Sequence, residues 1–284
     1  MRSWISAAFL SRDGHLRNGW WIAAFLGLLA ALLFPAILIS AQRGHEITML
    51  EQAGLIAVAT LAIQFIRRKS PWEVTGRPGG RWLIEMGLGA GIGALLMAVP
   101  ALFLTLGWIQ WSVASIHPSA LWSGVLLMLG VAVAEELLFR GLLFQRLIDG
   151  LGLWPAQVIV GLFFVLTHMG NPNMEGATRL WAGANIFLAS IVFGLAYFRT
   201  RSLALPIGLH FMANVTQGVV LGFGVSGASE PSLLIPRFTT DQTWLTGGAF
   251  GLEASLPGLV AVVALLSALL VWKRTPRSTA GQAG

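Results

Sequence analysis

The sequence predicts an all-α polytopic membrane protein with about eight transmembrane helices and both termini on the cytoplasmic side. Hydrophobic residues make up 56% of the 284 residues and charged residues only 11%, whereas a soluble domain carries about 25% charged residues. Long apolar runs recur along the whole chain, separated by short polar turns. The sequence therefore contains no stretch that reads as a separate soluble domain.

Each predicted span is an apolar run of roughly the 20 residues that a helix needs to cross about 30 Å of hydrocarbon. The runs are residues 20–39, 49–66, 82–106, 121–147, 152–169, 180–198, 203–223 and 255–272. The connection 224–254 is long and rich in Gly, Ser, Thr and Pro. Residues 1–19 begin like a signal peptide, but Arg12 and Asp13 interrupt the short apolar part, which predicts a retained interfacial segment.

The basic residues set the orientation, because cytoplasmic loops are enriched in Lys and Arg. Of the 18 basic residues, 15 fall on one side of the predicted spans. They are Arg2, Arg12, Arg17, Arg67, Arg68, Lys69, Arg77, Arg81, Arg140, Arg146, Arg199, Arg201, Lys273, Arg274 and Arg277. The alternate connections hold only Arg43, Arg179 and Arg237. This asymmetry predicts that both termini face the cytoplasm.

Composition also excludes several kinds of chemistry and partner. Cysteine is absent, which removes disulfides, thiolate nucleophiles and Cys-ligated metals. The net charge is +6, but the basic residues do not cluster with aromatic residues as they do on a nucleic-acid surface. We therefore expect membrane lipid, and no nucleic acid, around this chain.

A few ionisable side chains remain inside the predicted spans once the span ends are set aside. They are Glu135, Glu136 and Arg140 in the fourth span, His168 in the fifth and His210 in the seventh, where Asn214 follows. A charge at the centre of a membrane helix costs about 2.5–3.5 kcal/mol, so such residues mark functional sites. Glu51 and Glu85 lie within a turn of predicted helix ends, where they can reach the interface.

Helical spacing predicts how these side chains are organised. Glu136 and Arg140 are four residues apart and share one helix face, which favours an ion pair. Glu135 is rotated by about 100° from Glu136 and so turns toward another helix. His210 and Asn214 are also four residues apart, so both project from one face.

A Glu carboxylate, two His imidazoles and an Asn amide are the groups needed to hydrolyse an amide bond with water. A carboxylate can take the proton of the water, and an imidazole can orient the water or protonate the leaving amine. A second His and an Asn amide can donate hydrogen bonds to the developing oxyanion. No Gly-x-Ser-x-Gly or Ser-x-x-Lys pattern offers a serine nucleophile.

Three motifs in these spans resemble those of a known family. Glu135-Glu136-Leu-Leu-Phe-Arg140 fits Glu-Glu-x-x-x-Arg, Phe164-Val-Leu-Thr-His168 fits Phe-x-x-x-His, and His210-Phe-Met-Ala-Asn214 fits His-x-x-x-Asn. In order and separation they resemble the CAAX-protease and bacteriocin-processing (abortive-infection) family of intramembrane glutamic endopeptidases. The resemblance covers residues 120–220.

The resemblance implies a role for each of these residues. Glu135 is the base that activates water, His168 is its partner, and His210 with Asn214 forms the oxyanion hole. Glu136, Arg140 and Phe164 support them. It also implies an endopeptidase of the bacterial cytoplasmic membrane without a cofactor. Its substrate would be a prenylated or other membrane-associated peptide or protein, or a bacteriocin-related one.

The chain then divides into three regions. Residues 1–119 hold the interfacial segment and three transmembrane helices without a recognised motif. Residues 120–223 form the intramembrane protease core, and residues 224–284 an external loop and the last helix. We expect the site to open toward the cytoplasm. At 1.5 Å per residue, Glu135 and His210 lie about 10 Å from the cytoplasmic face and His168 lies about 20 Å from it. If these residues form one site, His168 must lie at the same depth as Glu135.

Other functions remain open from the residues alone. Glu135, His168 and His210 could bind Zn²⁺ with water in the open position, although no His-Glu-x-x-His motif is present. A non-catalytic immunity protein or scaffold could share the fold, because fold does not determine function. A proton-coupled transporter would also bury Glu and His, but the two halves show no paired broken helices.

Overall fold

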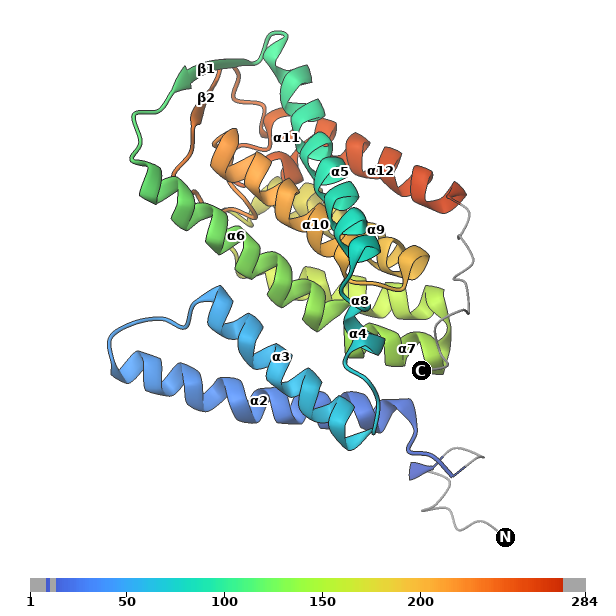
Figure 1. Ribbon diagram of the computed structural model, residues 1–284. Helices are drawn as coiled ribbons and strands as arrows, with labels where there is room; N and C mark the ends of the chain where they lie inside the picture. The colour runs from blue at the N-terminus through green and yellow to red at the C-terminus, as the bar shows by residue number, and fades with distance from the viewer. Residues whose placement is uncertain (1–8, 11–13, 273–284) are drawn as a thin grey trace.

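The computed structural model describes residues 9–10 and 14–272, and this part of the chain is mostly helical (Figure 1). The helices before the family-like motifs are α2 (Asn18–Gln42), α3 (Met49–Ile66), α4 (Trp72–Thr75) and α5 (Gly80–Thr105). Those carrying the motifs are α6 (Pro118–Phe139), α7 (Leu142–Leu151), α8 (Leu153–His168), α9 (Gly176–Thr200), α10 (Ala204–Asn214) and the π-helix η1 (Val215–Val220). The short α11 (Thr243–Thr246), the 3₁₀ helix η2 (Leu252–Ala254) and α12 (Leu256–Val271) follow.

The described helices have the length and the apolar surface of a multi-pass membrane protein. Five stretches are long and apolar enough to cross a membrane, namely Asn18–Gln42, Met49–Ile66, Gly80–Thr105, Pro118–Leu151 and Gly176–Thr200. The helices α8 and α12 are shorter but also apolar. Large apolar side chains such as Phe65, Leu83 and Ile84 are exposed on the outside of these helices, where lipid would cover them. The predicted interfacial segment at residues 1–8 and 11–13, and the basic residues Arg2, Arg12, Lys273, Arg274 and Arg277, lie outside the described residues.

The predicted fourth span, 121–147, lies within the candidate span Pro118–Leu151, but its helix is interrupted. Helix α6 ends at Phe139 and α7 begins at Leu142. The junction is tight, since a Cβ on Gly141 would lie 2.0 Å from the carbonyl oxygen of Leu137. Arg140, which the sequence suggested as a basic residue at a span end, has a side chain with no exposed surface. The positive-inside rule applies to basic residues in loops, so the buried Arg140 does not indicate which side of the membrane this helix end faces.

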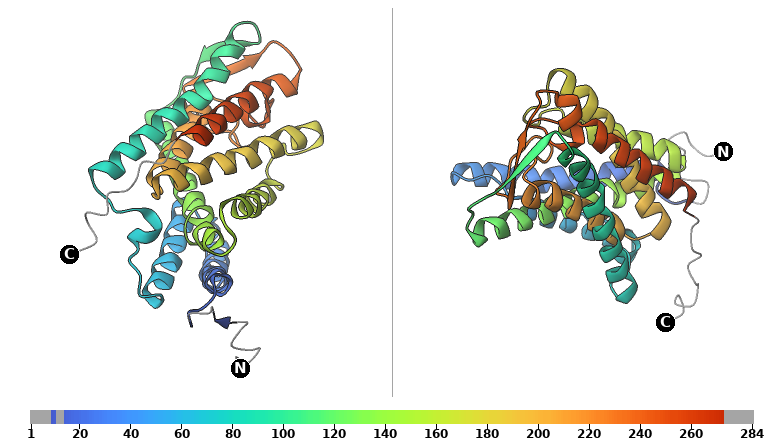
Figure 2. Two further views of the ribbon diagram at one scale, coloured as in Figure 1. Left: turned by 90° about the vertical axis from the view of Figure 1, so that its right-hand side faces the viewer. Right: turned by 90° about the horizontal axis from the view of Figure 1, so that it is seen from above.

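The arrangement of helices places α10 inside the bundle. It packs against α5, α6 and α9, and nine of its 11 residues are buried. Helix α12 covers α9 and α5, while α2 and α3 form a hairpin that packs on α7 and α6. Figure 1 and the left view of Figure 2 show this hairpin on one side of the molecule, with α5, α10 and α12 on the other.

Glycines allow α5 and α10 to approach closely. A Cβ on Gly93 of α5 would lie 2.1 Å from the carbonyl oxygen of Leu209, and one on Gly208 of α10 would lie 2.1 Å from that of Met86. Gly89, one turn before Gly93, meets the oxygen of Leu205 in the same way, at 2.2 Å. Small residues four apart let membrane helices approach until their backbones touch. This contact sets the position of α10 and of the side chains that it carries.

We expect Gly93→Ala to destabilise the protein by about 1–3 kcal/mol, the usual cost of overpacking. The new methyl group meets backbone rather than a side chain, so the two helices must separate. The matched control is Gly91→Ala, because a Cβ at Gly91 has nothing within 4 Å. Thermal unfolding in detergent should show a lower midpoint for Gly93→Ala than for the wild type. The midpoint of Gly91→Ala should stay unchanged. Equal midpoints would show that this close contact is dispensable.

A small sheet departs from the all-α prediction. Strand β1 (Ile109–Val113), after α5, pairs antiparallel with β2 (Leu234–Phe238), with Ile109 opposite Phe238 and Val113 opposite Leu234. Five-residue strands in connecting segments give too short a pattern for periodicity to identify. The pairing ties the 224–254 connection to the segment between α5 and α6 (Figure 1).

Candidate active site

The two adjacent glutamates point into different environments, as the helical spacing predicts. Both lie in the last turns of α6. The side chain of Glu136 has no exposed surface, whereas 20% of the Glu135 side chain is exposed. Only Glu135 is therefore accessible to a ligand or to water.

Glu136 belongs to a buried cluster centred on Arg140. Arg140 Nη1 lies 3.3 Å from Glu136 Oε1, and Arg140 Nη2 donates to the carbonyl oxygen and the hydroxyl of Ser190 on α9, at 3.1 and 2.8 Å. The guanidinium also lies 4.7 Å from the ring centre of Phe164 and 5.0 Å from that of Phe193. A buried charge is tolerated when it is paired and hydrogen-bonded, and aromatic faces stabilise a cation further. The predicted ion pair is present.

His210 is held between the two glutamates. Its Nδ1 lies 2.9 Å from Glu136 Oε1, and its Nε2 lies 3.9 Å from Glu135 Oε2. The ring stacks on Phe193 with the centres 4.8 Å apart. Because an ionised Glu136 can only accept a hydrogen bond, Nδ1 carries a proton and Nε2 faces the accessible carboxylate. Glu136 thus fixes the orientation of His210.

His168 is fixed by its own helix. It is the last residue of α8, and its Nδ1 lies 2.7 Å from the carbonyl oxygen of Phe164, one turn earlier. A carbonyl oxygen accepts, so Nδ1 donates, and in a neutral ring Nε2 then has a free lone pair. The Phe164 ring contacts both the His168 ring, at 4.6 Å between centres, and Arg140. The four-residue spacing of Phe164 and His168 places these contacts on one helix face.

Glu135 and His168 line one cavity, as one shared site requires. Helix α8 turns back against α7 at Gly152 and is six residues longer than α7, 16 against 10. At 1.5 Å per residue this difference carries the end of α8, where His168 lies, about 9 Å beyond the start of α7.

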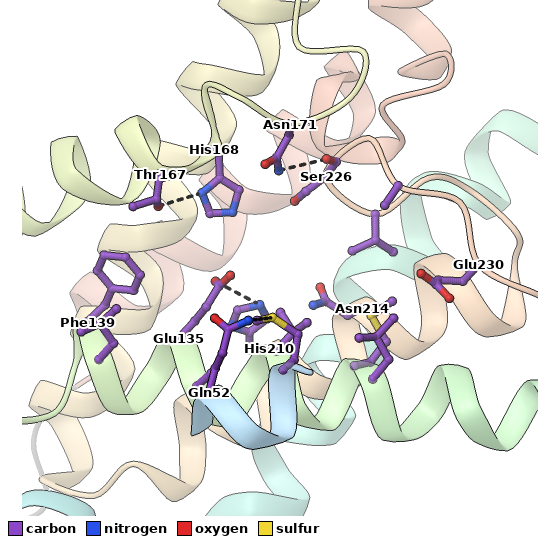
Figure 3. Close-up of a pocket in the computed structure, with 18 of the residues that line it drawn as sticks. Gln52, Glu135, Phe139, Thr167, His168, Asn171, His210, Asn214, Ser226 and Glu230 are labelled. Carbon is purple, nitrogen blue, oxygen red and sulfur yellow. Dashed lines mark hydrogen bonds and ion pairs between the residues drawn. The ribbon is translucent and has the colours of Figure 1, made fainter. Parts of the chain in front are cut away.

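Four of the predicted residues line one cavity of about 430 Å³. They are Glu135, His168, His210 and Asn214, which come from three different helices (Figure 3). Figure 3 shows Glu135 and His168 on facing walls, with His210 and Asn214 along the floor. Glu136, Arg140 and Phe164 do not line this cavity and lie behind it. The structure therefore brings all seven predicted residues together in two layers.

One expected contact is absent. The resemblance makes His168 the partner of Glu135, yet no hydrogen bond joins the two side chains. The imidazole in contact with Glu135 is that of His210, while His168 faces the carboxylate across the cavity (Figure 3). A water molecule between Glu135 and His168 would connect them.

The side chains do not form a metal site as they stand. Among the described residues, no three His, Cys, Asp or Glu side chains are grouped so that they could hold a metal ion. His210 Nδ1 contacts Glu136 and His168 Nδ1 contacts a backbone carbonyl. Metal-binding imidazoles are commonly held in the same way, so these bonds do not decide between the zinc alternative and a site without metal.

Several residues of the site were missed from the sequence. Gln52, Asn171, Ser226 and Glu230 line the same cavity, and Ser190 and Phe193 hold Arg140 or His210. Burial raises the pKa of the Glu230 carboxyl. Ser190 could have been suspected, because a lone polar residue in an apolar helix tends to face the interior. The loop residues have no comparable signal.

The expected opening toward the cytoplasm conflicts with the segments around the cavity. Besides α6, α10 and the end of α8 these are the start of α3, residues 171–172 and residues within 225–230. All three belong to the connections that are poor in basic residues. With the orientation that the positive-inside rule predicts, this rim faces away from the cytoplasm.

We therefore expect a cysteine at Ser229 to react with a membrane-impermeant maleimide on intact cells. A cysteine at Arg77, in the basic loop, should react only after the membrane is broken. Both positions are exposed, and the native chain has no cysteine to interfere. The opposite labelling pattern would reverse the orientation and restore a cytoplasmic opening.

The fold and the site define a class: a multi-pass helical membrane protein with a buried carboxylate–imidazole centre facing an internal cavity. Comparison with known proteins points to a family. Residues 117–216 match the family model described as type II CAAX prenyl endopeptidase Rce1-like. The region that carries the site is similar to this protease family, in agreement with the resemblance that the motifs predict.

A curated relative is similar over more of the chain. CAAX prenyl protease 2 of Methanococcus maripaludis is 23% identical over 234 residues, which cover 75% of this chain and 78% of the relative. The similarity therefore extends beyond residues 117–216. All four cavity residues named by the motifs fall inside the matched range.

Proposed function

We propose that this protein is an intramembrane glutamic endopeptidase that hydrolyses peptide bonds with water activated by Glu135. Its substrates are membrane-associated peptides or proteins, and prenylated C-termini of the CAAX type are the first class to test, because the relative's name specifies them. The proposal includes no cofactor.

Each step has a residue in a suitable place. Water held between Glu135 and His168 attacks the carbonyl carbon of the scissile bond while Glu135 takes one of its protons. The carbonyl oxygen becomes an oxyanion. When the intermediate collapses, the carbon–nitrogen bond breaks, and the proton held by Glu135 passes to the amine that leaves. The products are one carboxylic acid and one amine, and Glu135 returns to its starting state.

The histidines have different parts in this scheme. His168 Nε2, left with a lone pair by the bond from Nδ1 to Phe164, accepts the second hydrogen of the water and orients it. His210 donates from Nε2 to the oxyanion, which requires both ring nitrogens to carry protons. His210 with both nitrogens protonated is positively charged, and the carboxylates of Glu136 and Glu135 on either side stabilise this positive charge. Asn214, on the same helix face, supplies the second donor.

One observation carries the proposal. Of two adjacent glutamates, Glu136 is buried between Arg140 and His210, whereas Glu135 lines a cavity with His168, His210 and Asn214 and lies 3.9 Å from His210. A packing contact would require only the first. The second keeps 20% of its side chain exposed, where it can bind water.

The test is a cleavage assay on purified protein in detergent and in liposomes. The substrates are a peptide library with and without prenylated C-terminal cysteines, and mass spectrometry identifies the products. Cleavage by the wild type that is lost in Glu135→Gln is the expected result. Cleavage of equal rate in both proteins would refute the role of Glu135. A folded wild type that cleaves no member would favour the non-catalytic scaffold or immunity protein.

We expect cleavage to persist after treatment with EDTA or 1,10-phenanthroline, because the scheme uses only protein side chains. Elemental analysis of the purified protein should find zinc well below one atom per chain. Loss of activity with a chelator and its recovery with Zn²⁺ would instead support the alternative in which Glu135, His168 and His210 are ligands.

A further inference from the structure

A further carboxylate, that of Glu253, approaches the site from outside the region that matches the family model. Glu253 lies on η2, just before α12, whereas the match ends at residue 216. Its Oε2 accepts two hydrogen bonds from Ser226, one from the backbone N–H at 2.8 Å and one from the hydroxyl at 2.9 Å. The carboxylate thus holds a turn that forms part of the cavity wall.

That turn needs to be held. Residues Val225 and Ala228 pair as an isolated bridge, and between them Ser226 has φ +48°. A non-glycine residue in the left-handed region is strained, at a cost of about 1–3 kcal/mol, and persists only where its surroundings impose it. The two bonds from Ser226 to Glu253 are such a restraint.

The restraint continues to His168 through hydrogen bonds. The carbonyl oxygen of Ser226 accepts from Asn171 Nδ2 at 3.0 Å. The backbone N–H of Asn171 in turn donates to the carbonyl oxygen of His168, also at 3.0 Å. Figure 3 shows Asn171 and Ser226 joined above the His168 ring. Glu253, Ser226, Asn171 and His168 form one connected chain between η2 and the end of α8.

Glu253 also faces the imidazoles directly. With His168, His210, Asn214 and Asn185 it lines a second, small cavity of about 50 Å³. Burial raises the pKa of the Glu253 carboxyl, and the hydrogen bonds from Ser226 oppose this rise. The small cavity shares His168, His210, Asn214 and Ser226 with the large one.

We propose that Glu253 is a positioning residue of the active site, acting through Ser226 and Asn171 to fix the end of α8 and the His168 imidazole. The inference rests on the proposed function for its consequence in catalysis. Its structural content, that a residue 85 positions further along the chain holds His168 in place, does not depend on cleavage.

The variants separate hydrogen bonding from charge and from folding. Glu253→Ala removes the acceptor, whereas Glu253→Gln keeps an oxygen that can accept both bonds from Ser226 but removes the charge. Asn171→Ala cuts the same chain one link further on. Glu46→Ala is the control, because Glu46 is an exposed glutamate in another loop. If Glu253→Ala does not fold, Asn171→Ala and Glu253→Gln still test the chain.

Two measurements are made on each variant: hydrogen–deuterium exchange of the peptides that cover residues 166–174, and steady-state kinetics of cleavage. Glu253→Ala should increase exchange in this segment and lower kcat by about 10- to 100-fold, the effect of a small misplacement of a reacting group, with KM little changed. In Glu253→Gln, both the exchange of this segment and kcat should be close to the wild-type values. The double variant Glu253→Ala/Asn171→Ala should be no worse than either single one, because members of one network are not additive.

Several results would overturn the proposal. These are unchanged exchange and kcat in Glu253→Ala, no recovery in Glu253→Gln, additive effects in the double variant, or increased exchange throughout the chain, which would indicate general destabilisation. If the wild type shows no cleavage dependent on Glu135, the proposed function fails, and exchange at residues 166–174 still decides whether Glu253 holds the end of α8.

Discussion

Glu135→Gln should reduce kcat/KM for peptide cleavage by about 10³-fold, within the range that a general base contributes. Glutamine has the same size but cannot take a proton from water. Stability should change little, because Glu135 Oε2 is buried without a hydrogen-bond partner and its contact with His210 is 3.9 Å long. The measurement is kcat/KM together with the thermal midpoint of each purified protein.

The matched control for this substitution is Glu85→Gln. Glu85 is also flanked by apolar residues, but it pairs with Arg81 at 2.9 Å, near the start of α5, away from the cavity. Activity in Glu85→Gln should stay close to that of the wild type. Should Glu135→Gln keep most of its activity while Glu136→Gln loses it, the roles of the two adjacent glutamates are exchanged.

Arg140→Met should destabilise the protein by about 3–5 kcal/mol, the cost of removing one partner of a buried ion pair. The side chains of Arg140 and Glu136 have no exposed surface, so the carboxylate would be left in the interior with only His210. The bonds to Ser190 and the contacts with Phe164 and Phe193 would also be lost. Unfolding in a denaturing detergent series measures the effect.

Arg81→Met provides a comparison at the same spacing. Arg81 and Glu85 are also four residues apart, but 59% of the Arg81 side chain is exposed, and exposed pairs contribute about 0–1 kcal/mol. The double variant Glu136→Gln/Arg140→Met should lose less stability than the sum of its two single variants, since no unpaired charge remains. Equal losses in Arg81→Met and Arg140→Met would contradict a special role for the buried pair.

Local pattern was sufficient for much of the helical framework. The ends of α3, α8 and α12 lie within about a residue or two of the apolar runs, as is usual for helix boundaries. The ion pair of Glu136 with Arg140, the separate direction of Glu135 and the shared face of His210 and Asn214 also follow from helical spacing. The prediction of a helix-end charge is confirmed for Glu51, which forms a capping box with Thr48. Glu85 is buried and pairs with Arg81.

Other features depended on contacts between distant segments. The turn at Gly141 interrupts a run that is apolar on both sides, so hydropathy could not locate it. Ser190 and Phe193 reach Arg140 only because α9 packs there. The position of the rim around the cavity, which conflicts with the expected cytoplasmic opening, depends on loops whose sequences are unremarkable.

The sequence by itself determined that this is a helical membrane protein, which family its core resembles and which charged residues lie inside the bilayer. These properties are local, since length, hydropathy and the 3.6-residue period act within one helix. The tertiary structure decided that His168 shares a cavity with Glu135, that His210 is oriented by Glu136, and that Glu253 reaches the site. A membrane helix is apolar on most faces, so its pattern does not state which face meets which neighbour. Close packing through glycines and buried hydrogen bonds makes that choice.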